Sequence, residues 1–294
     1  MGLRIRTNVP ALIAQRRLQS TTSEMANNME KLSSGNRINK SADDAAGLAI
    51  SDTLTAKIRS LDQAKRNAND GVSLIQVAEG SMNEISNILV RMRELSTQAA
   101  SDTIGNQERS FANKEYTQLV DEIDRISNTT EFNGINLLGG ADKNNGVGEL
   151  TIHIGAGDGA QENTDTFALN IDSIKLDAQN VLGLNKDAEI GPTAPDGDFD
   201  RASAAEKLGV IDKAIKTVAG NRALLGAKQS RLNSAITNLG SQIENMSTTR
   251  SRIRDVDYAE VTAQFTQNRI LAQAGTSVLA QASAVPELSL KLLG

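Results

Sequence analysis

The sequence predicts a mainly α-helical protein, an elongated helical bundle or coiled-coil rod formed by the N- and C-terminal halves, with a small β-hairpin in the middle. Two long apolar seams repeat every seven residues, one over residues 61–99 and one over residues 208–253. Only 2% of the 294 residues are aromatic. Thin helical rods are packed by Leu, Ile, Met and Ala, so this composition favours a rod over a thick globular interior.

Each seam has two lines of residues. The first seam comprises Leu61, Ala68, Ile75, Met82, Leu89 and Ser96 with Ala64, Gly71, Ala78, Ile85, Met92 and Ala99. The second comprises Leu208, Ile215, Ile236 and Ile243 with Ile211, Val218, Leu225, Leu232, Leu239, Met246 and Ile253. Burial of apolar surface is worth roughly 25 cal/mol per Å², so the two stripes are expected to pack together. Arg222, Gln229 and Arg250 interrupt the second seam. We interpret Gln229 as a rim position, whereas both arginines fit either a rim position or a choice of register or subunit contact.

Five helices are expected in order along the chain. The first covers residues 3–32, and the second starts near Ala42, with Ser41 as N-cap and Asp44 as its partner, and ends near residues 101–106. The third, residues 107–127, should bury a face made of Phe111, Tyr116, Leu119, Ile123 and Ile126. The fourth resumes near Ala202, charged residues 250–257 interrupt the pattern, and Pro286 ends or bends the fifth.

The middle of the chain has a different period. Residues 128–140 carry turn signals. Between residues 148 and 174, Leu150, Ile152 and Ile154 alternate with polar residues, as do Phe167, Leu169 and Ile171, which predicts a hairpin. Residues 186–200 read as a surface loop, and the whole segment 139–200 is expected to be an excursion at one end of the bundle.

Charge and cysteine content narrow the classes of protein. The net charge of −5 argues against a nucleic-acid partner, and the absence of Cys excludes a disulfide framework. Residues 1–20 have no unbroken apolar stretch of a secretory signal, and no segment is long and apolar enough to span a bilayer. We therefore expect a cytosolic protein or one exported by a route that cleaves no leader.

No residue pattern predicts catalysis. His153 is the only histidine and is expected to be a partly exposed strand residue, not a metal ligand or general base. The glycine-rich run 155–159 lacks the Lys-Ser/Thr of a phosphate loop, and Asp43 and Asp44 fit the positive end of a helix dipole. We therefore predict no catalytic, cofactor-binding or metal-binding residues.

Several longer motifs resemble bacterial flagellins. They are LSSGNRIN at residues 32–39, DDAAGLA at 43–49, ANDGVSLIQVAEG at 68–80, TEFNG at 130–134 and QASAVP at 281–286. The resemblance covers residues 1–140 and 201–294. It implies a short form of the flagellar filament subunit, with residues 1–40 and 255–294 as terminal helices of the inner filament core, 41–140 and 201–254 as the helical rod, and 141–200 as a short hairpin and loop.

The resemblance also implies partners and a place in the cell. These are a homopolymer with other flagellin subunits, hook-associated and cap proteins, an export chaperone on the last helix, and a type III export apparatus that delivers the chain unfolded to the extracellular filament. Toll-like receptor 5 recognises a family segment that maps onto residues 90–98. Arg91, Leu95 and Gln98 would be its contact residues, with Glu115 on the facing helix.

Two other functions are kept as alternatives. A hook–filament junction protein would share the N-terminal pattern but would cap filaments. A filament-borne enzyme would need catalysis from the short segment 141–200, which has no metal motif.

Overall fold

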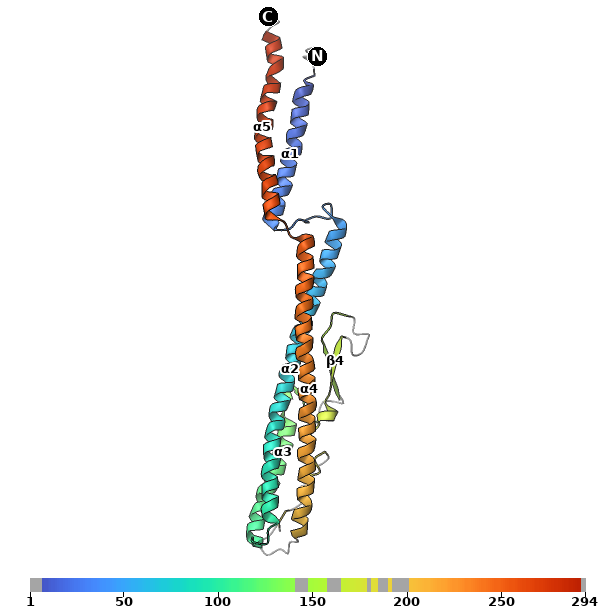
Figure 1. Cartoon of the computed structure of the whole chain (residues 1–294), viewed down its shortest axis with the longest axis vertical. Coiled ribbons are helices and arrows are strands. Elements are labelled where there is room, and N and C mark those ends of the chain that lie inside the picture. Colours follow the sequence, from blue (N-terminus) through green and yellow to red (C-terminus); the bar gives the residue numbers. More distant parts are fainter. Residues whose placement is uncertain are drawn as a thin grey trace. The chain divides into compact units, whose positions relative to one another are not determined.

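The computed structural model describes residues 7–140, 148–157, 165–178, 181–184, 190–191 and 201–291. The elements are, in order, α1 (Val9–Ser34), α2 (Ala45–Ala99), α3 (Asn106–Thr129), β1 (Glu131–Phe132), β2 (Ile135–Asn136), β3 (Glu149–His153), β4 (Thr166–Asn170), the 3-10 helix η2 (Asp172–Ile174), α4 (Arg201–Arg254) and α5 (Tyr258–Lys291), as labelled in Figure 1. The predicted mainly α fold with a small central hairpin is confirmed.

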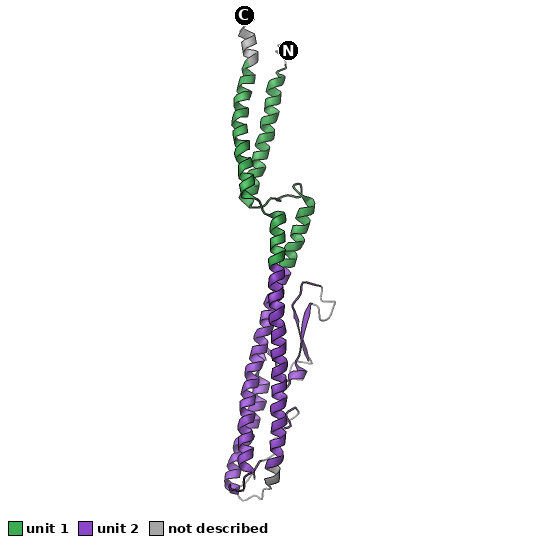
Figure 2. Ribbon diagram, in the orientation of Figure 1, with its two compact units in different colours: residues 1–58, 244–294 green, residues 59–243 purple. Residues whose placement is uncertain are grey.

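The chain divides into two compact units, coloured in Figure 2. Residues 1–58 and 244–294 form unit 1, and residues 59–243 form unit 2. Both α2 and α4 contribute residues to each unit.

Unit 2 is a bundle of α2, α3 and α4. The part of α2 that belongs to unit 2 has about 40 residues, so it is about 60 Å long and the bundle is elongated. Both lines of the first seam are buried, and in the second seam the line of Ile211, Val218, Leu225, Leu232 and Leu239 is buried. The other line, with Ile215 and Ile236, is half-buried. Arg222 lies at this rim, its Nη2 4.0 Å from Oε1 of Glu79.

Helix α3 adds a third buried line to α2. Leu74 and Leu95 are buried and Ile88 is half-buried, at intervals of multiples of seven residues, while Tyr116, Val120 and Ile123 of α3 are buried. A helix that contacts two partners needs a wider apolar stripe than a two-line seam. Phe111, predicted to face the core, is instead 56% exposed.

The middle segment lies along the bundle of unit 2, so the expected excursion at one end is wrong for its described residues. Strands β3 and β4 pair antiparallel, with Ile152 opposite Phe167. The side-chain amide of Asn67 donates to the His153 carbonyl (3.0 Å), and Lys228 Nζ donates to the Ala168 carbonyl (2.8 Å), which fixes the hairpin to α2 and α4.

After η2 the chain continues along α3. The amide of Ala178 donates to Asp124 Oδ1 (3.0 Å) and that of Ile190 to Asn113 Oδ1 (3.1 Å). Most described apolar side chains of this stretch are buried, namely Leu176, Ala178, Leu182, Leu184 and Ile190, whereas Val181 is exposed. The burial of Ile190 therefore contradicts the prediction of a surface loop at this position. Residues 186–189 and 192–200 lie outside the described residues.

Local boundaries differ from the prediction at several places, of which the following matter most. Helix α2 starts at Ala45 and its cap is Asp44, whose Oδ1 accepts from the Gly47 amide (2.9 Å), not Ser41. Residues 131–136 form a two-residue hairpin, β1 and β2, around Asn133 and Gly134, both with positive φ as an Asn-Gly turn requires. Helix α5 continues past Pro286 to Lys291, so Pro286 does not end this helix.

Unit 1 contains the antiparallel pair α1 and α5. Asn8 Nδ2 donates to the Ala282 carbonyl (2.7 Å) near one end of the pair. At Gly275 the helices come so close that an added Cβ would lie 3.3 Å from Leu18 Cδ1. The connector after α1 and the connector before α5 are joined at the other end by a bridge between Asn36 and Asp255.

Candidate assembly and recognition surfaces

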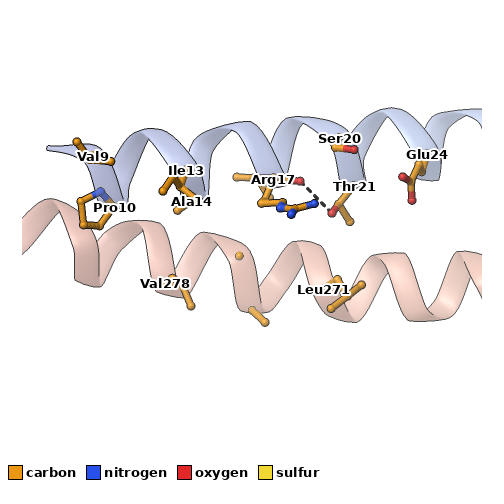
Figure 3. Close-up of a pocket in the computed structure, with 13 residues that line it drawn as sticks. Val9, Pro10, Ile13, Ala14, Arg17, Ser20, Thr21, Glu24, Leu271 and Val278 are labelled. Carbon is orange, nitrogen blue, oxygen red and sulfur yellow. Dashed lines mark hydrogen bonds between the residues drawn. The ribbon is translucent and has the colours of Figure 1, made fainter.

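An apolar groove runs between α1 and α5 (Figure 3). Val9 and Ile13 of α1 and Leu271 and Val278 of α5 line it, and each is between 48% and 58% exposed. Large apolar side chains scattered singly on a surface are ordinary, but these four lie along one groove. The groove is therefore a candidate interface.

Apolar side chains are also exposed on other sides of the pair. Leu12 on α1 and Ile270 on α5 are 56% and 61% exposed. At 100° per residue, Leu12 points away from the line of Ala14, Leu18 and Met25, whose half-buried side chains follow the α5-facing side. The pair thus offers apolar contacts on more than one side.

The pair buries little of its own surface. Asn28 is the one buried side chain recorded in α1, and Val261 is the one described side chain of α5 that reaches this class. Most helical stability in proteins comes from tertiary packing of an amphipathic face. Two helices that bury so little need additional partners to be stable.

The predicted recognition residues lie on α2 and α3 in unit 2. Arg91 Nε donates to Glu115 Oε1 (2.8 Å) across the two helices, and Arg91 Nη1 donates to Glu94 Oε2 (3.1 Å). The hydrogen bond that Arg91 donates to Glu115, followed by the one that it donates to Glu94, raises the pKa of the Arg91 guanidinium. Gln98 is exposed on the same helix. The structure therefore brings Arg91 and Glu115 together at a solvent-accessible, charged surface.

Leu95 does not project beside them. Leu95, predicted as a contact residue, is only 2% exposed and belongs to the hydrophobic core, so its side chain is not presented at this surface. Leu95 is about 40° around the helix from Arg91, while Gln98 is about 20° away on the other side. The edge of the buried stripe therefore lies between Leu95 on one side and Arg91 and Gln98 on the other.

Residues considered for chemistry have structural roles. His153 is an exposed β3 residue. Asp43 Oδ2 accepts from the amides of Lys40 and Asn39 (both 3.0 Å), and these bonds lower its pKa. Across the described stretches, no group of three or more His, Cys, Asp or Glu residues could hold a metal ion, and no helix is long and apolar enough to cross a membrane.

Paired helices that leave large apolar side chains exposed on more than one side are typical of helical structural proteins that assemble with further copies. Two family models match this chain. Residues 5–143 match the bacterial flagellin N-terminal helical region, and residues 208–293 match the bacterial flagellin C-terminal helical region. The chain belongs to the bacterial flagellin family.

Full-length relatives agree with this assignment. Flagellin of Bacillus subtilis is 42% identical over 313 residues, covering 99% of this chain and 100% of that protein. Flagellin of Halalkalibacterium halodurans is 40% identical over 289 residues, covering 98% and 99%. The chain is thus a structural subunit of the bacterial flagellar filament, which serves motility, and not an enzyme.

A solved structure shares the fold. It is a Vibrio parahaemolyticus protein named as flagellar hook-associated, with a TM-score of 0.58 at 15% identity, covering 72% of this chain and 100% of that chain. At this identity the likeness concerns the fold alone, so it does not favour the hook–filament junction alternative.

Proposed function

We propose that the α1–α5 pair supplies the principal contacts through which subunits join. Residues 1–40 and 255–294 then form the inner core of the filament, residues 41–140 and 201–254 the surrounding rod, and residues 141–200 a small hairpin and loop. The observation that carries the proposal is the set of exposed apolar side chains on several sides of the pair, with Leu12 and Ile270 foremost. Burying one such side chain contributes about 1.5–3 kcal/mol.

Seeded polymerisation followed by electron microscopy tests this function. Purified subunit added to filament fragments should form long polymers, whereas a hook–filament junction protein should stop at the seed ends. The double variant Leu12→Gln with Ile270→Gln loses two apolar contacts and should require at least about 100-fold more subunit to polymerise. Val181→Gln, a similar change at a 40% exposed residue outside the pair, is the matched control. Normal polymerisation of the double variant would place the contacts elsewhere.

Export is the second part of the proposal. The subunit travels unfolded through the flagellar type III apparatus to the extracellular filament, with a chaperone bound to α5 beforehand. The absence of Cys and the small buried area of α1 and α5 support this route, since nothing covalent has to be undone before threading. A subunit lacking residues 258–291 should fail to co-purify with the chaperone from the cytosol. Unchanged co-purification would contradict the assignment of α5.

Assembly also involves the hook-associated and cap proteins, which meet the same terminal helices at the two ends of a filament. Their apolar contacts would be those that the next subunit uses. The Leu12→Gln and Ile270→Gln variant should therefore lose binding to isolated hooks as well as to filament ends. If this variant still binds hooks, the contacts to hook-associated proteins differ from the contacts between subunits.

The third part concerns recognition by Toll-like receptor 5. Arg91, held by Glu115, together with Gln98, forms the contact surface on the free subunit, while Leu95 supports α2 from the core. An arginine positioned by a carboxylate is pre-organised for binding, because fewer rotamers are lost. Arg91→Ala should reduce receptor reporter signalling, whereas Arg125→Ala, which removes another exposed Arg–Glu pair (Nη2 to Glu122 Oε1, 2.6 Å), should not. Equal signalling by both variants would refute the assignment.

A further inference from the structure

The two connectors of unit 1 are hydrogen-bonded to each other. Residues 35–37, after α1, run antiparallel to residues 253–256, before α5, and together we call them the connector clasp. The Val256 amide donates to the Gly35 carbonyl (3.0 Å), and the Arg37 amide donates to the Arg254 carbonyl (2.6 Å). Asn36 and Asp255 therefore face each other as a non-hydrogen-bonded antiparallel pair.

Arg37 caps α4 from across the clasp. Its Nη2 donates to the Ile253 carbonyl (2.7 Å), in addition to the main-chain bond to Arg254. The last carbonyls of a helix lack partners within the helix and carry the negative end of its dipole. A guanidinium at that place both satisfies a carbonyl and opposes the dipole. One residue thereby joins segments that are 216 positions apart in the sequence.

The surroundings hold the clasp in place. Gly35 ends α1 with φ +71°, a conformation that favours glycine, and an added Cβ would lie 3.2 Å from Tyr258 Oη at the start of α5. Ile38, the residue after the clasp, is 2% exposed, and Val256 is also buried. The clasp is thus held by its hydrogen bonds, by the buried Val256 within it and by the buried Ile38 next to it, although Arg37 itself is exposed.

We propose that the connector clasp is the site where pairing of α1 with α5 begins, and that Arg37 is the positioning residue that starts it during addition of a subunit to the filament. This inference rests on the proposed role of the helix pair in assembly. Two helices from opposite ends of the chain must first be brought together, which is the entropically costly step. Once the clasp closes, each later turn of the antiparallel pair has its partner next to it, so the helices order outward from the clasp.

Removing the Arg37 side chain tests the first step. Arg37→Ala should slow seeded elongation about tenfold, as expected for loss of a charge-assisted hydrogen bond in the rate-determining pairing step. The exposed Arg252, in the last turn of the same helix, provides the control variant Arg252→Ala, which should elongate at the parent rate. Both variants should show the parent's thermal unfolding of unit 2, which separates a pairing defect from misfolding.

A crosslink across the clasp provides the rescue. Asn36→Cys with Asp255→Cys introduces two cysteines into a chain that has none. Non-hydrogen-bonded antiparallel pairs have Cα atoms about 4.5 Å apart, within the range of a disulfide. Added to Arg37→Ala and oxidised, this pair should restore elongation, and reduction should abolish the gain. Asn39→Cys with Asp255→Cys, three residues out of register, should not rescue.

The outcomes separate this inference from the proposed function. If the parent subunit forms no polymer on seeds, the function in assembly fails. If the parent polymerises and Arg37→Ala elongates equally fast, or if the oxidised crosslink restores nothing to a slow Arg37→Ala, the clasp is not the starting point. Slow elongation of Arg252→Ala would also overturn it, because the effect would then belong to any arginine at this end of α4.

Discussion

Replacing Leu95 with Ala should separate burial from recognition on α2. Leu95 is 2% exposed and packs in the core of unit 2. Buried Leu→Ala changes cost about 2–5 kcal/mol, from lost transfer free energy and the cavity left behind. In a unit of this size, 1 kcal/mol corresponds to about 2–4 °C, so the melting temperature should fall by about 10 °C. The conservative Leu95→Met should stay close to the parent.

Arg91→Ala should behave in the opposite way. Arg91 bonds to Glu94 and Glu115 at the surface, where its side chain is 50% exposed, and exposed ion pairs contribute little to stability. Its melting temperature should remain within about 2 °C of the parent while receptor signalling drops.

Far-ultraviolet circular dichroism during heating, beside a receptor reporter assay at a temperature where all variants are folded, gives both quantities. If the Leu95→Ala variant has the parent's melting temperature but does not signal, Leu95 makes an exposed contact with the receptor. Early melting of Arg91→Ala with full signalling would mean that Arg91 is structural and has no part in recognition. Either result refutes the reasoning from burial.

Three other predictions concern order, pH and packing. In the free subunit, amides at Ile13 and Leu271 should exchange rapidly and become protected in the filament, because α1 and α5 bury little alone; strong protection in the monomer would contradict this. Burial raises the pKa of Tyr116 to about 12, so its share of stability is complete below the unfolded value near 10 and is lost as the pH rises toward 12; absorbance titration of Tyr258→Phe, which leaves one of two tyrosines, measures it directly. Phe167→Ala should destabilise unit 2 by about 3–5 kcal/mol in urea unfolding, because Phe167 is buried beneath two cationic side chains; an unchanged midpoint would show that the hairpin does not support the bundle.

The helices and the hairpin could be predicted because their apolar periods are long and regular. Both lines of the first seam are buried, and the two predicted strands pair antiparallel, although the pattern does not specify the observed register of Ile152 opposite Phe167. Period alone fixes which residues share a face. It does not fix how many partners that face has.

The errors follow from that limit. A two-line seam leaves Leu95 outside the buried stripe, whereas α3 covers a third line of α2 that includes Leu95. The apolar pattern of residues 107–127 places Phe111 on the core face, although Phe111 is four residues before the exposed Glu115 and shares its side of α3. The clasp at Arg37 could not be predicted, because a single guanidinium bonded to a distant carbonyl leaves no periodic pattern.

Arg91 and Arg93 have a mechanical consequence for the bundle. Two residues apart on α2, they point about 200° from each other around the helix axis. Arg91 Nε meets Glu115 on α3 (2.8 Å), and Arg93 Nε meets Asp212 on α4 (2.7 Å). Rolling α2 about its own axis in either sense would pull both pairs apart together. These exposed ion pairs contribute little to the free energy of folding, but they can hold the rotational orientation of α2 about its own axis. The bundle would then resist twisting of α2 against α3 and α4.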